Sequence, residues 1–453
     1  MNKNTQKIIY NAIFKHKQFR LTNVKICYTL NSIYYFIVLL VVLSVLFHRF
    51  IIQLGCPEVF KYSLDGLNVL AFAFSLFNYK RNKQMFFSIS VTILFFILFG
   101  TLAIINGVHY FQFTLSNYLF DIRNVLRPFM FFFSCCTLLK FDQIEKIKNI
   151  LIAYHLVNFV YIVYQYFTLE VWAYWMRGDN LNGFFGTATG GNIYVNVMCI
   201  VTSIISLERF KEKKFTVFHS YFILSLNLLL ATLIELKMYY FEFAIIVGIF
   251  VFEIKLRKKM TTNKIIVILI SIICIPFIIY GMVLLMYKIY PSMAGSLSLQ
   301  GILKTTSQDG YTGRYDLNRL SFIKGINKSI FHNNKFLNMF GLGLGMANTN
   351  SSFFDLYDNT HYTWFSSAYV YIENGITGLI LYLLSFYIVL IFCNNQNKYY
   401  KKSIISTILM ITVVFFYNET MKTEANYLLV FLLASYFSEK TKRFTSYDLK
   451  TIT

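Results

Sequence analysis

Charged residues are scarce in this chain of 453 residues and make up 14% of it, whereas soluble globular proteins carry about 25%. Acidic residues are the scarcer sign, with 21 Asp and Glu against 42 Lys and Arg. Hydrophobic residues account for 57% of the chain. Apolar runs such as residues 31–48 can cross a hydrocarbon core of roughly 30 Å, which takes about 20 residues. The composition therefore excludes an ordinary soluble domain and predicts an integral membrane protein.

Motifs for metal, disulfide and nucleotide chemistry are also missing. The seven cysteines fall mostly inside apolar segments and form no C-x-x-C pair, which argues against a disulfide framework or a zinc site. Because no D-x-D, H-x-x-x-H or H-E-x-x-H motif occurs, we expect neither a metal ion nor a cofactor. The glycine run at 341–345 follows no clear strand and has no Walker lysine, so we interpret it as a backbone turn.

The net charge of +21 does not indicate a nucleic-acid partner. Lys and Arg collect in short loops between apolar segments, as they do in the cytoplasmic loops of membrane proteins. No basic stretch is interleaved with aromatic residues on a soluble surface. The predicted partner of this chain is the lipid bilayer.

Twelve apolar segments predict an all-α, polytopic protein with a single transmembrane domain over residues 1–453. With the N-terminus in the cytoplasm, every inner loop is basic, so both termini are expected to be cytoplasmic. The first apolar run has no small-residue cleavage site after it, and we expect it to be a retained span. The segments lie at about 31–48, 63–79, 85–105, 124–139, 149–168, 189–206, 216–235, 238–254, 265–287, 367–392, 403–417 and 425–438.

One long loop, residues 288–365, separates the ninth span from the tenth and is predicted to be extracytoplasmic. Within it, residues 315–331 carry an apolar stripe at helical spacing, and Asp316 near the start suits the helix dipole. We expect an amphipathic helix at the membrane surface. The stripe consists of Leu317, Leu320, Ile323, Ile326 and Ile330.

Several basic residues lie where the membrane should not tolerate them, and such residues are usually functional. Arg123 and Arg127 are one helical turn apart at the outer end of the fourth span, which suits either clasping one anion or snorkelling to the headgroups. Lys237 lies at the tight turn between the seventh and eighth spans, either as an anion ligand or in an internal pair with Glu235.

The long loop adds Arg314, Arg319 and His361 on the same outer side. Arg319 is either a ligand or part of a solvated face, and His361 is either polar surface or a general base. Several cations with few carboxylates beside them suit a diphosphate on a membrane-anchored substrate. Their charge would take the place of a metal ion in stabilising a diphosphate leaving group.

The order of these elements resembles the O-antigen polymerase and O-antigen ligase superfamily. In that family a long outer loop carries Gly-Arg, an amphipathic helix, a glycine turn, a His-containing segment and Glu-x-Gly-x-x-Gly. The loop before the sixth span, residues 177–192, is similar to an Arg-x-n-Gly-x-Phe loop of the family. The matching elements here are Gly313-Arg314, residues 315–331, residues 341–345, His361, and Glu373, Gly375 and Gly378.

Two departures set this chain apart from the ligases. They often have Ser-Arg at the outer rim, where this chain has Glu235, Leu236 and Lys237, so a lysine stands in for the arginine. They often have His-Asn where this chain has His361 and Tyr362. Both departures fit the more divergent polymerases.

The resemblance implies a membrane-embedded glycosyltransferase of the GT-C type in the bacterial inner membrane, with its active site on the extracytoplasmic side. The donor would be a glycan on undecaprenyl diphosphate and the acceptor another lipid-linked repeat unit, with a chain-length regulator protein as a further partner. Arg314 and Lys237 would hold the diphosphate, and His361 would orient or deprotonate the acceptor hydroxyl. The second-rank ligands are Arg123, Arg127, Arg177 and Arg319.

Two other functions stay open. The first is the O-antigen ligase, which shares the fold. The second is a flippase or transporter of lipid-linked oligosaccharides, a class that often shows internal repeats around a midplane site. The halves of this chain show no convincing repeat, and the cations gather at one face.

Overall fold

The structure is a computed structural model that describes residues 31–77, 83–169, 177–187, 190–256, 262–291, 294–298, 300–301, 317–393 and 399–438. All of the secondary structure in these residues is helical, which confirms the predicted all-α class. Among the predicted site residues, Arg314 lies outside the described residues, and so does Tyr315, the first residue of the predicted amphipathic helix.

Each of the twelve predicted apolar segments forms a helix, with ends that mostly shift by a few residues; the fourth and fifth begin well before the predicted 124 and 149, at Leu115 and Phe141. Within the described residues, five of these helices are long and apolar enough to cross a membrane, as in a multi-pass membrane protein: Asn31–Gln53, Lys83–Gly107, Phe141–Thr168, Asn192–Lys211 and Ser366–Ile391. The labelled helices of the twelve are α2 (Lys61–Phe77), α3 (Lys83–Gly107), α4 (Leu115–Leu138), α5 (Phe141–Thr168), α7 (Asn192–Lys211), α8 (Val217–Leu233), α9 (Lys237–Leu256), α10 (Thr262–Ile289), α15 (Ser366–Ile391), α16 (Lys401–Tyr417) and α17 (Asn426–Ser435).

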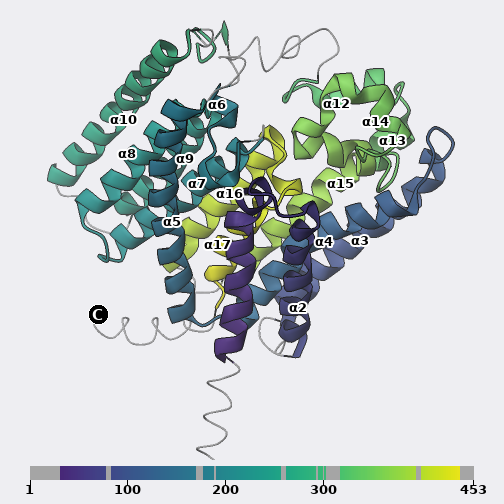
Figure 1. The fold of residues 1–453 in the computed structure, drawn as a ribbon, viewed down its shortest axis with the longest axis horizontal. Helices are drawn as coiled ribbons and strands as arrows, with labels where there is room; N and C mark the ends of the chain where they lie inside the picture. The colour runs from purple at the N-terminus through teal and green to yellow at the C-terminus, as the bar shows by residue number, and fades with distance from the viewer. Residues whose placement is uncertain are drawn as a thin grey trace, which may run out of the picture.

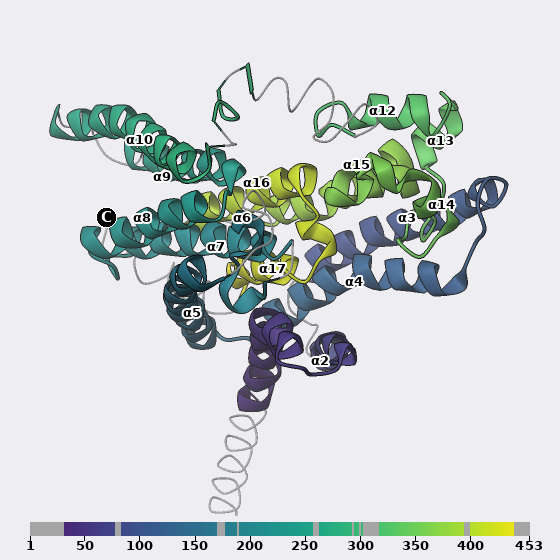
Figure 2. The same cartoon turned by 45° about the horizontal axis from the view of Figure 1, so that its top comes forward.

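The described residues also form short 3₁₀ helices and four short α-helices: α6 (Arg177–Asn180), α12 (Phe322–Ser329), α13 (Lys335–Phe340) and α14 (Ser352–Tyr357). Helix α15 packs along α3 and carries α13, while α4 packs between α2 and α17. In Figure 1, α12 to α14 lie at the upper end of the molecule and the start of the first helix lies at the lower end. Figure 2 shows the same separation from another side.

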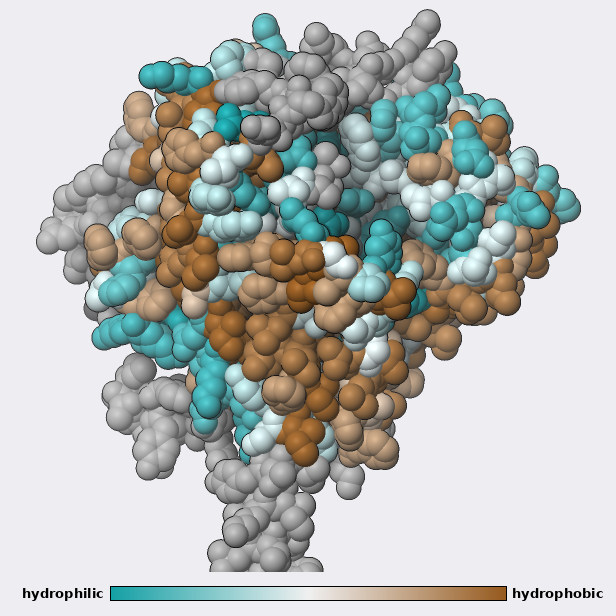
Figure 3. All heavy atoms as spheres, viewed as in Figure 1, coloured by the Kyte–Doolittle hydropathy of each residue, from teal (hydrophilic) through white to brown (hydrophobic). Residues whose placement is uncertain are grey.

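Apolar and polar side chains also gather on different parts of the surface. Hydrophobic side chains form a broad brown area over the lower middle and lower right of Figure 3, and hydrophilic side chains gather at the upper right, over the region of α12 to α14. Single apolar residues such as Phe77, at 84% exposure, and Ile391, at 76%, face outward from the long helices. Apolar surface of this extent suits lipid better than water.

The predicted surface helix is shorter than expected. It begins at Phe322, after the N-cap Ser321, instead of at residue 315. The side chain of Asn318 accepts a hydrogen bond from the Leu320 backbone N–H at 3.1 Å, and such a local bond competes with helix formation. Leu320 is 75% exposed and therefore does not belong to the apolar stripe. Of the expected stripe, Leu317, Ile326 and Ile330 are buried.

The glycine run forms the predicted backbone turn, and its N–H groups bond to carbonyls of α15 next to a break in that helix. Gly375 has a φ of 61° inside that helix, so the carbonyls one turn earlier lose their helical partners. The N–H of Leu342 donates to Ile372 O, and the N–H of Gly343 donates to Glu373 O, both at 2.8 Å. Gly341 has a φ of 76°, and a Cβ there would lie 2.3 Å from the carbonyl carbon of Glu373.

Replacing Gly341 with alanine is expected to lower the free energy of unfolding by about 2–4 kcal/mol, from left-handed strain and overpacking against α15. The control is Gly66→Ala in α2, where a Cβ meets nothing within 4 Å and alanine is the better helix former. Thermal unfolding in detergent compares the two variants. Equal melting temperatures for both would refute the role of the turn.

Candidate functional site

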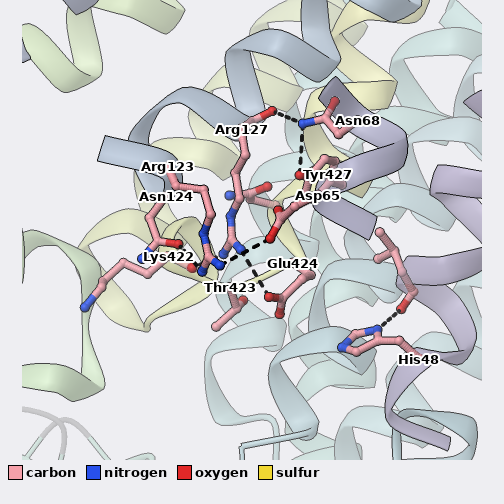
Figure 4. A network of polar contacts seen from close by, with 12 residues as sticks. His48, Asp65, Asn68, Arg123, Asn124, Arg127, Lys422, Thr423, Glu424 and Tyr427 are labelled. Carbon is pink, nitrogen blue, oxygen red and sulfur yellow. Dashed lines mark hydrogen bonds and ion pairs between the residues drawn. The ribbon is translucent and has the colours of Figure 1, made fainter. Parts of the chain in front are cut away.

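Arg127 lies at the centre of a buried polar network that joins α4 to the loop between α16 and α17. Its side chain is 3% exposed. Its Nη1 lies 3.1 Å from Glu424 Oε1, and its Nη2 donates to the Lys422 carbonyl. Asn68 of α2 donates to the Arg127 carbonyl at 2.9 Å. Figure 4 shows Arg123 and Arg127 extending together toward Lys422, Thr423 and Glu424.

Glu424 is the counter-ion of this network. Tyr194 of α7 donates to Glu424 Oε2 at 2.7 Å. Burial alone would raise the pKa of the Glu424 carboxyl, but the Arg127 guanidinium, His48 and the Tyr194 hydroxyl lower that pKa to about 2. Glu424 is therefore an anion at every physiological pH, and its charge balances that of Arg127.

Arg123 has its own carboxylate partner. Its Nη1 lies 3.3 Å from Asp65 Oδ2 of α2, and its guanidinium lies 4.1 Å from the centre of the Phe120 ring. The expectation that the outer cations have few carboxylates beside them is therefore wrong for Arg123 and Arg127. Any anion that binds them must compete with Asp65 and Glu424 or join them in one network.

A second cluster forms at the predicted rim turn between α8 and α9. Glu235 has a φ of 57° in the turn that precedes Lys237. Gly178 of α6 packs so closely that a Cβ there would lie 2.7 Å from Glu235 Cγ. Arg177 donates to the Tyr166 carbonyl and lies over the Tyr166 ring at 4.6 Å. The structure thus joins the 177–192 loop to the rim turn, as one site would require.

The rim cluster combines the carboxyl groups of Glu235 and Asp179 with the ammonium group of Lys237. Burial raises the pKa of the Glu235 carboxyl to about 7; the nearby Asp179 carboxylate adds to the rise and Lys237 opposes it. Burial also raises the pKa of Asp179, and Lys237 and a hydrogen bond from Asn192 oppose that rise. Lys237 therefore faces two carboxyl groups, one of which changes charge near neutral pH.

The Glu235→Gln variant is expected to gain stability relative to the wild type as the pH rises from 5 to 8. A carboxyl whose pKa is raised on folding binds its proton more tightly in the folded state than in the unfolded chain. Its contribution to stability therefore falls as the pH rises from the carboxyl's pKa in the unfolded chain toward its folded-state pKa of about 7. Glutamine lacks this dependence. Melting temperatures at pH 5, 6, 7 and 8 test the prediction, and a constant difference between the two proteins would contradict it.

The long loop brings Arg319 and His361 to neighbouring segments. The Leu317 backbone N–H donates to the Thr360 carbonyl at 3.0 Å, which joins the segment before Arg319 to the one before His361. The Nε of Arg319 donates to the Tyr417 carbonyl at 2.7 Å, at the end of α16, where a cation suits the helix dipole. His361 has a left-handed φ of 53° and lies against Trp364, with ring centres 4.0 Å apart.

The carboxylates and the lysine that complete this site were not among the residues predicted from the sequence. Lys422 and Glu424 lie in a seven-residue connection, 418–424, between two apolar segments, and that density of charge was the available signal. Asp65 was signalled by its place inside the apolar segment 63–79. Their roles could not be predicted because their partners lie far away in the sequence, as Arg127 and Glu424 do.

No protein-family model matches the chain, and no curated protein matches it at a significant level.

Proposed function

We propose that this chain is a polymerase of polysaccharide repeat units, of the O-antigen or capsule type. It transfers a growing glycan from undecaprenyl diphosphate to a lipid-linked acceptor repeat unit, without a metal ion. Arg314 and Lys237 hold the diphosphate, with Arg123, Arg127, Arg177 and Arg319 as further contributors. His361 orients or deprotonates the acceptor hydroxyl.

The observation that carries the proposal is the anchoring of the long loop onto the ends of several helices. The Leu317–Thr360 hydrogen bond joins the residues before Arg319 to the segment of His361, and the bond from Arg319 Nε to the Tyr417 carbonyl ties this part of the loop to the end of α16. Directly after the loop, the N–H of Ser366 donates to Asn418 O at 2.9 Å, at the start of the connection that holds Arg127 through Glu424. A loop fixed in this way can hold a substrate headgroup in one geometry, which favours an enzyme over a passive connection.

Contacts among the loops support the alternating topology, with twelve spans and both termini in the cytoplasm. Segments predicted inside contact each other: Lys148 Nζ lies 2.6 Å from Glu208 Oε1, and Tyr400 donates to Glu212 at 2.8 Å. Segments predicted outside do the same, because Gln53 donates to Thr187 at 3.1 Å. The proposal therefore includes an inner-membrane location and a site on the extracytoplasmic face.

Deleting the gene in its native host distinguishes the polymerase from the ligase and the flippase. Loss of a polymerase should leave single repeat units on the surface acceptor and no long chains. Long chains that stay on the lipid carrier would instead identify a ligase, and repeat units retained at the inner leaflet would identify a flippase. Restoration of long chains by the wild-type gene is the control.

A further inference from the structure

A small pocket lies beside the N-terminal parts of α4 and α15 and the connection between α16 and α17. Its volume is about 30 Å³, which is room for roughly two ordered waters. A hydroxyl group fits a space of this size, whereas a sugar ring does not. The polar side chains that line it include Asp121, Asn124, Ser366, Tyr369, Glu373 and Lys422.

The pocket is built around two carboxyl groups that are each 2% exposed, Asp121 and Glu373. The Tyr369 hydroxyl lies 2.9 Å from both carboxylate oxygens of Asp121. Glu373 Oε1 accepts from the N–H groups of Gly345, at 2.9 Å, and Ala347, at 3.3 Å, so the glycine turn fixes its position. The Glu373 carboxyl also interacts directly with that of Asp121.

Lys422 supplies the positive charge of the pocket. Its Nζ lies 2.7 Å from the centre of the Tyr369 ring. Burial lowers the pKa of the Lys422 ammonium to about 8, although the carboxylates of Asp121, Glu373 and Glu419 oppose that shift. The pocket therefore brings two carboxyl groups and an amine together in one polar unit. Such a unit is a functional-site candidate when it lines a cavity.

We propose that this pocket receives the attacking hydroxyl group of the acceptor sugar and that Asp121 accepts its proton. The proposal rests on the polymerase function proposed above and assigns the base within it. The glycine turn donates hydrogen bonds to Glu373 but not to Asp121, so we assign the role of base to Asp121. His361, which lies against Trp364, keeps the role of orienting the acceptor.

The transfer step is then balanced at named atoms. A lone pair of the acceptor oxygen forms the new bond to the anomeric carbon of the donor. The bond from that carbon to the diphosphate oxygen breaks, and its electron pair leaves with undecaprenyl diphosphate. The hydroxyl proton passes to a carboxylate oxygen of Asp121. Tyr369 and Lys422 act as positioning residues that hold Asp121 and stabilise its charged form.

The test compares elongation by purified wild-type protein with elongation by Asp121→Asn, and both proteins are also assayed for binding of undecaprenyl diphosphate. A lost general base should reduce turnover about 100-fold or more, with diphosphate binding unchanged within twofold. The matched control is Glu242→Gln, which alters a fully buried carboxyl that does not line the pocket and should keep wild-type turnover.

Tyr369→Phe provides a second, milder readout that does not depend on the asparagine variant folding. Removing the hydroxyl that donates to Asp121 should move the acid limb of the pH–rate profile to higher pH, while a merely structural role would leave that limb in place. Wild-type turnover by Asp121→Asn, or an unshifted limb with Tyr369→Phe, would overturn the assignment. Absence of elongation by the wild-type protein would instead refute the polymerase function itself.

Discussion

Replacing Arg127 with methionine is expected to lower the free energy of unfolding by about 3 kcal/mol, because the change leaves the partly buried Glu424 without its counter-ion. The Nη1 contact to Glu424, at 3.1 Å, and the bond to the Lys422 carbonyl are both lost. Methionine fills much of the space, so the loss reports charge rather than volume. Chemical or thermal unfolding in detergent measures it.

The double variant Arg127→Met with Glu424→Gln is the matched control. It removes both charges, and replacing a buried pair as a whole is far less damaging than removing one member. We therefore expect the second change to restore much of the stability lost in the first. Additive losses in the double variant would contradict the account of Arg127 and Glu424 as one charge-balanced pair.

Arg314→Ala is expected to abolish long-chain polymer while the amount of protein in the membrane stays normal. A guanidinium can make two parallel hydrogen bonds to diphosphate oxygens, and removing a donor that stabilises developing charge costs about 10²–10³-fold in turnover. The length distribution of the polysaccharide on a gel reads out the effect.

Two further substitutions in the same loop sharpen this prediction. Arg314→Lys keeps the charge but not the planar fork, so its turnover should lie between those of the wild type and the alanine variant. Lys328→Ala removes an exposed cation in α12 and should leave chain lengths unchanged. Wild-type chain lengths in Arg314→Ala would remove that residue from the site.

The helices were predictable from the sequence because lipid requires long apolar segments with every backbone group paired internally. The turn at residues 341–345 was predictable because three glycines alternate there, and all three adopt positive φ. The start of α12 was not, because the hydrogen bond from Leu320 N–H to Asn318 is a local competitor that apolar spacing does not reveal.

The site could be predicted only in part, for a different reason. Spacing along one helix places Arg123 and Arg127 together, but it says nothing about partners on other helices. Tertiary packing brings Asp65 to Arg123 and Glu424 to Arg127. It also brings Lys422 to Tyr369. The rim turn was the exception, since a nearly absent connection between two apolar segments placed Glu235 and Lys237 at the surface of the bundle.

The most direct test of the account is the length of glycan made by the purified wild-type protein in lipid vesicles, supplied with lipid-linked repeat units and a chelator. The account predicts chains of several repeat units on undecaprenyl diphosphate, with release of one undecaprenyl diphosphate for each addition and no response to added magnesium. Single repeat units that remain unjoined, or elongation that appears only when magnesium is restored, would contradict it.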